Sequence, residues 1–253
     1  MFARRPAPIQ VNWLGYPGTM GAPYIDYILA DPVVIPPGHE QYYAEKVVRL
    51  PDSYQVNDRH RTIAPTQYTR TQLGLPEDGF VFCCFNNNYK ITPDVFDVWM
   101  RLLLAVPRSV LWLLADNEEV PVNLRREAEA RGVSADRIVF APRMPLPEHL
   151  ARHRCADLFL DTLPYNAHTT TSDALWAGLP VLTCIGRTFA GRVAASLLTA
   201  AGMPELIADT TLEYEALALH LATDPAELAR LRKRLASQIG PAPLFDTDRF
   251  RHH

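Results

Sequence analysis

Between residues 80 and 200, short apolar runs alternate with segments of helical spacing, and this alternation constrains the fold most strongly. The first run, residues 80–85, is continuously apolar, which is typical of a strand covered on both faces in a parallel sheet. Further strands are expected at 109–114, 137–140, 157–160 and 180–183. Helices are expected at 93–106, 123–131, 147–153, 170–177, 190–200, 212–222 and 225–239, the first with Thr92 as its N-cap. The pattern predicts βαβ units in an α/β fold with a Rossmann-like, doubly wound parallel sheet.

The first 65 residues have a different character, because they are dense in proline, glycine and aromatic residues. Short strands are expected at 9–14, 27–30 and 46–50, and residues 15–21 form a glycine-containing loop between the first two. The composition of residues 62–70 is that of a linker. We therefore expect two units: residues 1–65, and a larger Rossmann-like domain at residues 66–253.

Composition narrows the classes of function. The chain has 25 Lys and Arg against 28 Asp and Glu, and this net charge of −3 argues against a protein that binds duplex nucleic acid. No apolar run approaches the roughly 20 residues of a membrane span. The four cysteines form no Cys-x-x-Cys pair, which argues against a disulfide framework or a zinc site. We therefore expect a cytoplasmic protein without a nucleic-acid or membrane partner.

Ligands of doubly wound sheets bind beyond the carboxyl ends of the strands, so polar residues at those positions are the first candidates for a site. Asn87 and Lys90 follow the first apolar run. Asparagine supplies neutral donors and acceptors, and lysine can meet an anion as a point charge. The alternative interpretation is a polar turn that carries a surface lysine.

The second candidate is the start of the helix expected at 170–177. A helix N-terminus carries free N–H groups and a partial positive charge, which suit a phosphate. Hydroxyl side chains crowd this start, although one is enough for a cap: Thr169, Thr170, Thr171 and Ser172. His168 can donate to a phosphate oxygen, and Asp173 can accept from a ribose hydroxyl. The alternative is an over-capped helix with a structural histidine. No Gly-x-Gly-x-x-Gly or Walker motif is present, which disfavours dinucleotide oxidoreductases and P-loop kinases.

Two further strand-to-helix junctions carry polar residues. In the first, His149 can stack on a base with Arg152 one turn on; a surface or core histidine is the alternative. His149 and His153 also have the spacing of a helical metal pair, but no third ligand is arranged with them, so we expect no metal. In the second, residues 186–196, Arg192 and neighbouring hydroxyls could contact an oxyanion or a sugar, or simply cap the helix.

Taken together, segments 5–10, 13–19, 85–90, 166–178 and 192–196 resemble the protein O-GlcNAc transferase / SPINDLY family in residues, order and spacing. The resemblance covers nearly the whole chain. It implies a glycosyltransferase of the GT-B type, in which two Rossmann-like domains hold a nucleotide-sugar in the cleft between them. It also implies an inverting, metal-independent reaction without a cofactor. The implied donor is UDP-GlcNAc, or GDP-fucose in SPINDLY members, and the implied acceptor is a Ser or Thr hydroxyl of a protein.

The resemblance implies roles for individual residues. Lys90 and His168 are expected to be catalytic, with Lys90 neutralising the departing diphosphate. The other expected donor-binding residues are Thr169 and Thr170 in the diphosphate cradle, Asp173 at the ribose, His149 on the base, and Arg152 and Asn87 nearby. Asn87 stands where animal members have Gln, and Leu146 stands where they have Lys.

The resemblance also implies missing parts. Family members carry a tetratricopeptide array and the first part of an N-terminal catalytic lobe ahead of the segment matched by residues 5–8. We therefore expect residues 1–65 to be a remnant of that lobe and residues 251–253 to fall inside a last helix. Three hypotheses remain open from the sequence: a transferase with this donor, a non-catalytic nucleotide-binding remnant, and a related transferase that uses GDP-fucose or another donor.

Overall fold

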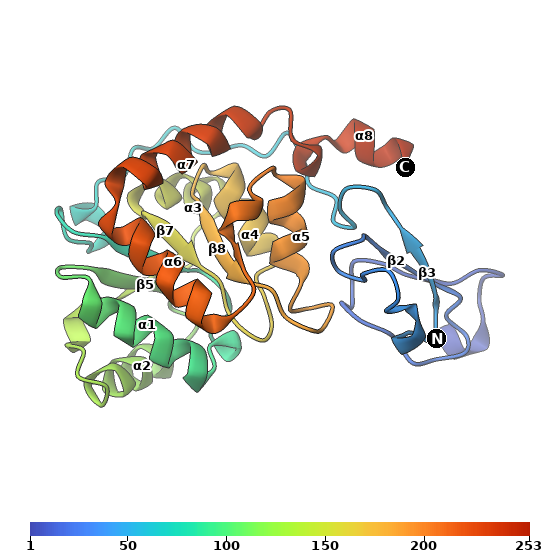
Figure 1. Cartoon of the computed structure of the whole chain (residues 1–253), viewed down its shortest axis with the longest axis horizontal. Coiled ribbons are helices and arrows are strands. Elements are labelled where there is room, and N and C mark those ends of the chain that lie inside the picture. Colours follow the sequence, from blue (N-terminus) through green and yellow to red (C-terminus); the bar gives the residue numbers. More distant parts are fainter.

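A computed structural model describes all 253 residues and contains two parallel sheets. The smaller sheet lies near the N-terminus and consists of β1 (Val11–Asn12), β2 (Tyr27–Ala30) and β3 (Lys46–Arg49), in that spatial order. All three strands were expected, but β1 covers only the middle of the expected strand at 9–14. In Figure 1 this N-terminal unit forms one end of the molecule, beside α5 (Val193–Ala200).

The alternation around β1 is reversed relative to an ordinary half-buried strand. Ile9, Val11 and Trp13 are exposed, whereas Gln10 and Asn12 are buried. The two buried amides are used in the fold, because Nε2 of Gln10 donates to the carbonyl oxygen of Phe2 and Nδ2 of Asn12 donates to that of Gly18. The apolar side chains of this segment therefore face outward.

The larger sheet has six parallel strands in the order β6-β5-β4-β7-β8-β9. Their bounds are β4 (Val81–Cys84), β5 (Val110–Leu114), β6 (Ile138–Ala141), β7 (Leu158–Leu160), β8 (Val181–Cys184) and β9 (Ile207–Ala208). This is the strand order of a doubly wound Rossmann-type sheet, so the predicted fold class is confirmed. The two-residue strand β9 was not expected. The strand order reverses between β4 and β7, where such sheets bind ligands.

The helices cover both faces of this sheet. In chain order they are α1 (Pro93–Ala105), α2 (Glu119–Glu129), α3 (Leu146–Arg152), α4 (Thr169–Trp176), α5, α6 (Thr211–Thr223), α7 (Pro225–Gln238) and α8 (Thr247–His252). The expected cap of α1 is present, since the Thr92 side chain accepts from the amide of Val95. None of the helices is both long and apolar enough to cross a membrane.

The core of the larger unit follows from its strands. Every residue of β4 and of β5 is buried, in agreement with strands that are covered on both faces. The same core continues into the N-terminal unit through Ile28, Ile35 and Tyr54. The four cysteines are buried and free.

Buried polar contacts join the two units. The Asp31 carboxylate accepts from the amides of Val33, Val34 and Tyr54, each at 2.9 Å, and from the Ser196 hydroxyl of α5 at 2.6 Å. The three amide bonds order the N-terminal unit after β2, and the bond from Ser196 ties this unit to the larger one. The boundary expected at residue 65 falls in a stretch without helix or strand and stays a prediction.

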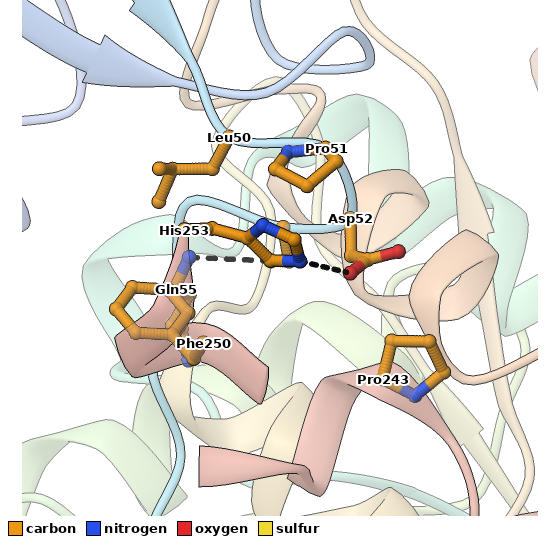
Figure 2. A pocket seen from close by; sticks show the side chains of 8 residues that line it. Leu50, Pro51, Asp52, Gln55, Pro243, Phe250 and His253 are labelled. Atoms are coloured by element: carbon orange, nitrogen blue, oxygen red, sulfur yellow. Dashed lines mark hydrogen bonds and ion pairs between the residues drawn. The ribbon is translucent and has the colours of Figure 1, made fainter. Parts of the chain in front are cut away.

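The C-terminal helix α8 also contacts the N-terminal unit, and the C-terminus lies at the same end of the molecule as that unit (Figure 1). Arg249 donates two hydrogen bonds to Asp52, at 2.6 and 3.0 Å, and Phe250 stacks on Trp13. Figure 2 shows His253 directed at the same Asp52 carboxylate, 3.9 Å away. The larger unit is therefore tied to the smaller one at both α5 and α8.

Candidate functional site

A buried polar network lies where β4 and β7 end. Asn86 follows β4 directly, and its Nδ2 donates to Oγ1 of Thr162 at 2.8 Å and to Asp161 at 3.3 Å. The Asp161 carboxylate also accepts from the amides of Thr162 and Ala167 and from the Thr183 hydroxyl. Burial raises the pKa of Asp161 to about 7 against these hydrogen bonds, which favour the carboxylate. The network fixes the loop that leads into α4.

The start of α4 is free of side-chain caps. His168 occupies the N-cap position but makes no capping bond, and the amides of Thr169 and Thr170 have no acceptor in the protein. The over-capping in the alternative interpretation is therefore wrong. The Thr170 hydroxyl donates to Asn86, and the Thr171 hydroxyl donates to the carbonyl oxygen of Ala167. Because the amides of Thr169 and Thr170 are left without an acceptor at a helix N-terminus, this start has the electrostatics of an anion site.

Lys90 and His168 meet at this helix start. The Lys90 ammonium donates to the carbonyl oxygen of Asn166 at 2.9 Å and lies 4.2 Å from the ring centroid of Tyr165. The His168 ring stacks on the same tyrosine, with the centroids 5.0 Å apart. Burial lowers the pKa of His168 to about 4, and repulsion by Lys90 adds to this. Burial also lowers the pKa of Lys90, with Asp161 opposing. The structure thus brings both expected catalytic residues to one edge of the sheet.

A cavity of about 290 Å³ lies beside the start of α4. Four of the expected donor-binding residues line it: Asn87, His149, Arg152 and Thr170. The rest of the lining is mostly apolar, with Phe85, Leu114, Met144 and Leu146, and also includes Arg143. An apolar wall with a few convergent polar groups is typical of a small-molecule site.

Arg152 determines which ring nitrogen of His149 carries the proton. The Arg152 side chain is completely buried, its guanidinium lies 4.6 Å from the Phe85 ring centroid, and its Nη2 lies 2.5 Å from Nδ1 of His149. A guanidinium can only donate, so Nδ1 accepts and the proton of neutral His149 is on Nε2. Burial, with repulsion from His153 and Arg152, lowers the pKa of His149 to about 2. His149 is therefore a neutral ring at ordinary pH.

The helical pair His149 and His153 is not arranged as a metal site. Nδ1 of His153 lies 2.7 Å from the carbonyl oxygen of His149, and the two rings pack edge to face. No group of three or more potential metal-ligating side chains is present. His153 is a buried core histidine, one of the two alternatives considered for this segment.

Asp173 lies in the first turns of α4 and forms a short ion pair with Arg61. Sequence reasoning missed Arg61, which comes from the stretch between the two sheets. Trp176 supports the arginine, because its Nε1 donates to the Arg61 carbonyl oxygen at 3.1 Å and its ring lies 5.6 Å from the guanidinium. A second cavity of about 280 Å³ is lined by Arg61, His168 and Thr169. The ribose role of Asp173 stays a prediction.

The junction at 186–196 has a structural role. Nε of Arg192 donates to the carbonyl oxygen of Val33 at 2.6 Å and its Nη1 to that of Gly186 at 3.0 Å, so this arginine joins the two units. Gly191 is required here, since a Cβ would lie 2.7 Å from the carbonyl oxygen of Pro164. Arg192 makes no side-chain capping bond, and the oxyanion or sugar contact considered for this segment stays a prediction.

The sequence matches glycosyl transferase family 41 over residues 1–67 and 62–253. The chain is 42% identical to the probable UDP-N-acetylglucosamine–peptide N-acetylglucosaminyltransferase SEC of Arabidopsis thaliana, and the match covers 99% of this chain and 26% of the relative. It is 38% identical to a probable enzyme of the same description, SPINDLY, from Petunia hybrida, with 99% and 27% covered. The chain thus spans about a quarter of the length of these relatives.

Solved structures agree. The fold matches a mutant of the O-GlcNAc transferase of Thermobaculum terrenum with a TM-score of 0.85 and 38% identity, over 99% of this chain and 48% of the solved one. It matches WaaG, a glycosyltransferase involved in lipopolysaccharide biosynthesis, with a TM-score of 0.60 and 15% identity, over 99% and 78%. The first match confirms the family resemblance, and the second supports the fold alone. This chain belongs to glycosyl transferase family 41 and has a fold of the GT-B type.

Proposed function

We propose that this chain carries the donor half of a glycosyltransferase that moves N-acetylglucosamine from UDP-GlcNAc to a Ser or Thr hydroxyl of a protein. One observation carries the proposal. The uncapped start of α4 presents two free amides, of Thr169 and Thr170, beside the Lys90 ammonium and the His168 ring. The names of the relatives, which describe UDP-N-acetylglucosamine and peptide as substrates, support the same reaction.

The transfer reaction requires positive charge next to the diphosphate leaving group. When the acceptor hydroxyl attacks the anomeric carbon and inverts it, a new C–O bond forms as the bond to the diphosphate breaks. The electron pair of the broken bond stays on a phosphate oxygen, and the hydroxyl proton is lost to solvent. Negative charge therefore grows on the leaving group as the transition state forms. Lys90 and the amide end of α4 stabilise that charge, and such groups accelerate a reaction because they act more strongly in the transition state. The proposal includes no metal and no further cofactor.

In this proposal the base of the donor occupies the cavity beside α4. The neutral His149 ring stacks on the base, and the diphosphate lies next to Asn87 and Thr170, which line the same cavity. Asp173 accepts from a ribose hydroxyl while Arg61 holds one of its carboxylate oxygens. The four free, buried cysteines suit a reducing compartment, and we propose the cytoplasm.

Calorimetry with UDP, UDP-GlcNAc and GDP tests the donor half. We expect UDP to bind, and we expect Lys90→Ala and His168→Ala each to abolish or strongly weaken binding. Lys233→Ala removes an exposed lysine from α7 and serves as the matched control. Absence of heat with every nucleotide would contradict the proposal, and tighter binding of GDP would reassign the donor.

A transfer assay tests the reaction itself. The chain is incubated with UDP-GlcNAc and a Ser/Thr-containing peptide, and the peptide mass is measured. A mass increase of one N-acetylhexosamine is expected. Binding of UDP without transfer would leave this chain as a nucleotide-binding unit and assign the acceptor half to another polypeptide segment.

A further inference from the structure

Tyr165 connects the buried polar network around Asn86 to the two expected catalytic residues, Lys90 and His168. Its backbone carbonyl oxygen accepts from the Thr162 hydroxyl at 2.7 Å, and Thr162 is itself bonded to the buried Asn86. The next residue, Asn166, donates its amide to the carbonyl oxygen of Ala190 at 3.0 Å. These bonds fix the backbone at Tyr165 and at the next residue, and so limit where the tyrosine ring can lie.

The Lys90 ammonium is held only by neutral groups. It donates to the carbonyl oxygen of Asn166 and faces the Tyr165 ring; the buried Asp161 acts on it electrostatically but forms no ion pair with it. An ammonium has three N–H donors, so this arrangement leaves donor capacity for a ligand. A carboxylate at the position of the ring would also hold the lysine, but it would cancel the charge that an anionic ligand needs. An aromatic face attracts a cation without carrying a net charge.

His168 rests on the same ring. The interplanar angle of 21° and the centroid distance of 5.0 Å make this a stacked contact, and the only other polar contact of the imidazole is a long one of 3.3 Å from Nε2 to the carbonyl oxygen of Ala190. The Tyr165 hydroxyl has no hydrogen-bond partner in the protein. The contribution of this residue to the site is therefore that of its ring.

We propose that Tyr165 is a positioning residue of the donor site, whose ring holds the Lys90 ammonium and the His168 imidazole in register with the amide end of α4 without neutralising the lysine. The inference rests on the proposed function and adds to it the group that aligns the cationic Lys90 and the neutral His168. Tyr165 acts through Lys90 and His168, and its ring gives the positive charge a fixed place before the donor arrives.

Three variants separate this role from a merely structural one. Tyr165→Phe keeps the ring and removes a hydroxyl that bonds to nothing in the protein. Tyr165→Leu and Tyr165→Gln remove the ring, and having two such variants covers the case in which one of them folds poorly. Tyr89→Leu is the matched control, because Tyr89 adjoins Lys90 in sequence but is exposed.

UDP affinity is the first readout. Loss of the ring is expected to weaken UDP binding roughly five- to thirty-fold, the range for a cation–π contact that is partly shielded from water. The UDP affinity of Tyr165→Phe is expected to stay within about threefold of that of the original chain, and Tyr89→Leu is expected to leave it unchanged. Equal affinities for the Leu, Gln and Phe variants would overturn the inference.

The titration of His168, followed by NMR in the ligand-free protein, is the second readout and does not depend on nucleotide binding. Without the ring, water reaches the imidazole and Lys90 is released from its side, so the His168 pKa is expected to rise toward its ordinary value. It is expected to stay low in Tyr165→Phe. If the original chain binds no UDP, the proposed function fails, and this titration still decides the role of Tyr165: an unchanged His168 pKa in both ring-less variants would refute it.

Discussion

Replacing Asp31 by alanine tests how much a buried, multiply bonded carboxylate at the end of β2 stabilises the fold. The carboxylate accepts from three amides and one hydroxyl, and the bonds to Val34, Tyr54 and Ser196 are buried. Each buried donor that loses its acceptor costs about 1–3 kcal/mol. The Ser196 hydroxyl can turn to Oγ of Ser53, 3.5 Å away, so the amides account for most of the loss. We expect a loss of roughly 3–6 kcal/mol in the free energy of unfolding.

Such a loss is a large part of the roughly 5–15 kcal/mol that stabilises a typical domain. Urea unfolding followed by tryptophan fluorescence measures it as a shift of the midpoint. The urea midpoint of Asp31→Asn is expected to lie between those of the original chain and Asp31→Ala, because the amide oxygen of the new side chain can still accept from the amides of Val33 and Val34.

Asp52→Ala is the control for this experiment. Asp52 also joins the two units, but its partner Arg249 is half exposed (49% of its side chain), and exposed ion pairs add little to stability because water screens them. If Asp31→Ala were no more destabilising than Asp52→Ala, the reasoning from buried amides would be refuted.

Three further predictions concern protonation and capping. Burial holds the pKa of His149 near 2 and the pKa values of His153 and His168 near 4, whereas histidines of the unfolded chain take up protons near pH 6.5. The free energy of unfolding is therefore expected to be highest above pH 6.5 and to fall as the pH drops toward 4. A constant urea midpoint between pH 7 and 5 would contradict this. Arg152→Met frees Nδ1 of His149, so ¹⁵N NMR should show a mixture of tautomers in place of the Nε2–H form, and an unchanged spectrum would count against the assignment. Thr92→Ala removes the cap of α1 and should lower the free energy of unfolding by about 1 kcal/mol, measured by the same urea titration, with no change as the contrary result.

Local pattern was enough to predict the framework of the site. The continuous apolar run at 80–85 predicts a strand that is buried on both faces, and the structure has the central strand β4 there. Lys90 and His168 each follow a strand of a doubly wound sheet, and strands β4 and β7 flank the point where the order reverses. Their convergence therefore follows from the topology, and only the order of the strands could not be predicted from the sequence.

Contacts between distant segments could not be predicted in this way. Arg61 and Asp173 are 112 residues apart, and Asp31 and Ser196 are 165 residues apart. Sequence spacing carries no information about which loops meet across two units, because many arrangements bury the same apolar surface. Tyr165 was missed for a related reason: an aromatic residue in a loop has no signature until the cation that it faces is placed.

The account depends most on where the two phosphates of the nucleotide rest. A crystal structure of this chain with UDP measures that directly. We expect phosphate oxygens at hydrogen-bond distance, about 3 Å, from the amides of Thr169 and Thr170 and from the Lys90 ammonium. A UDP molecule whose phosphates lie away from the start of α4, with Lys90 still bonded only to Asn166 and Tyr165, would contradict the account.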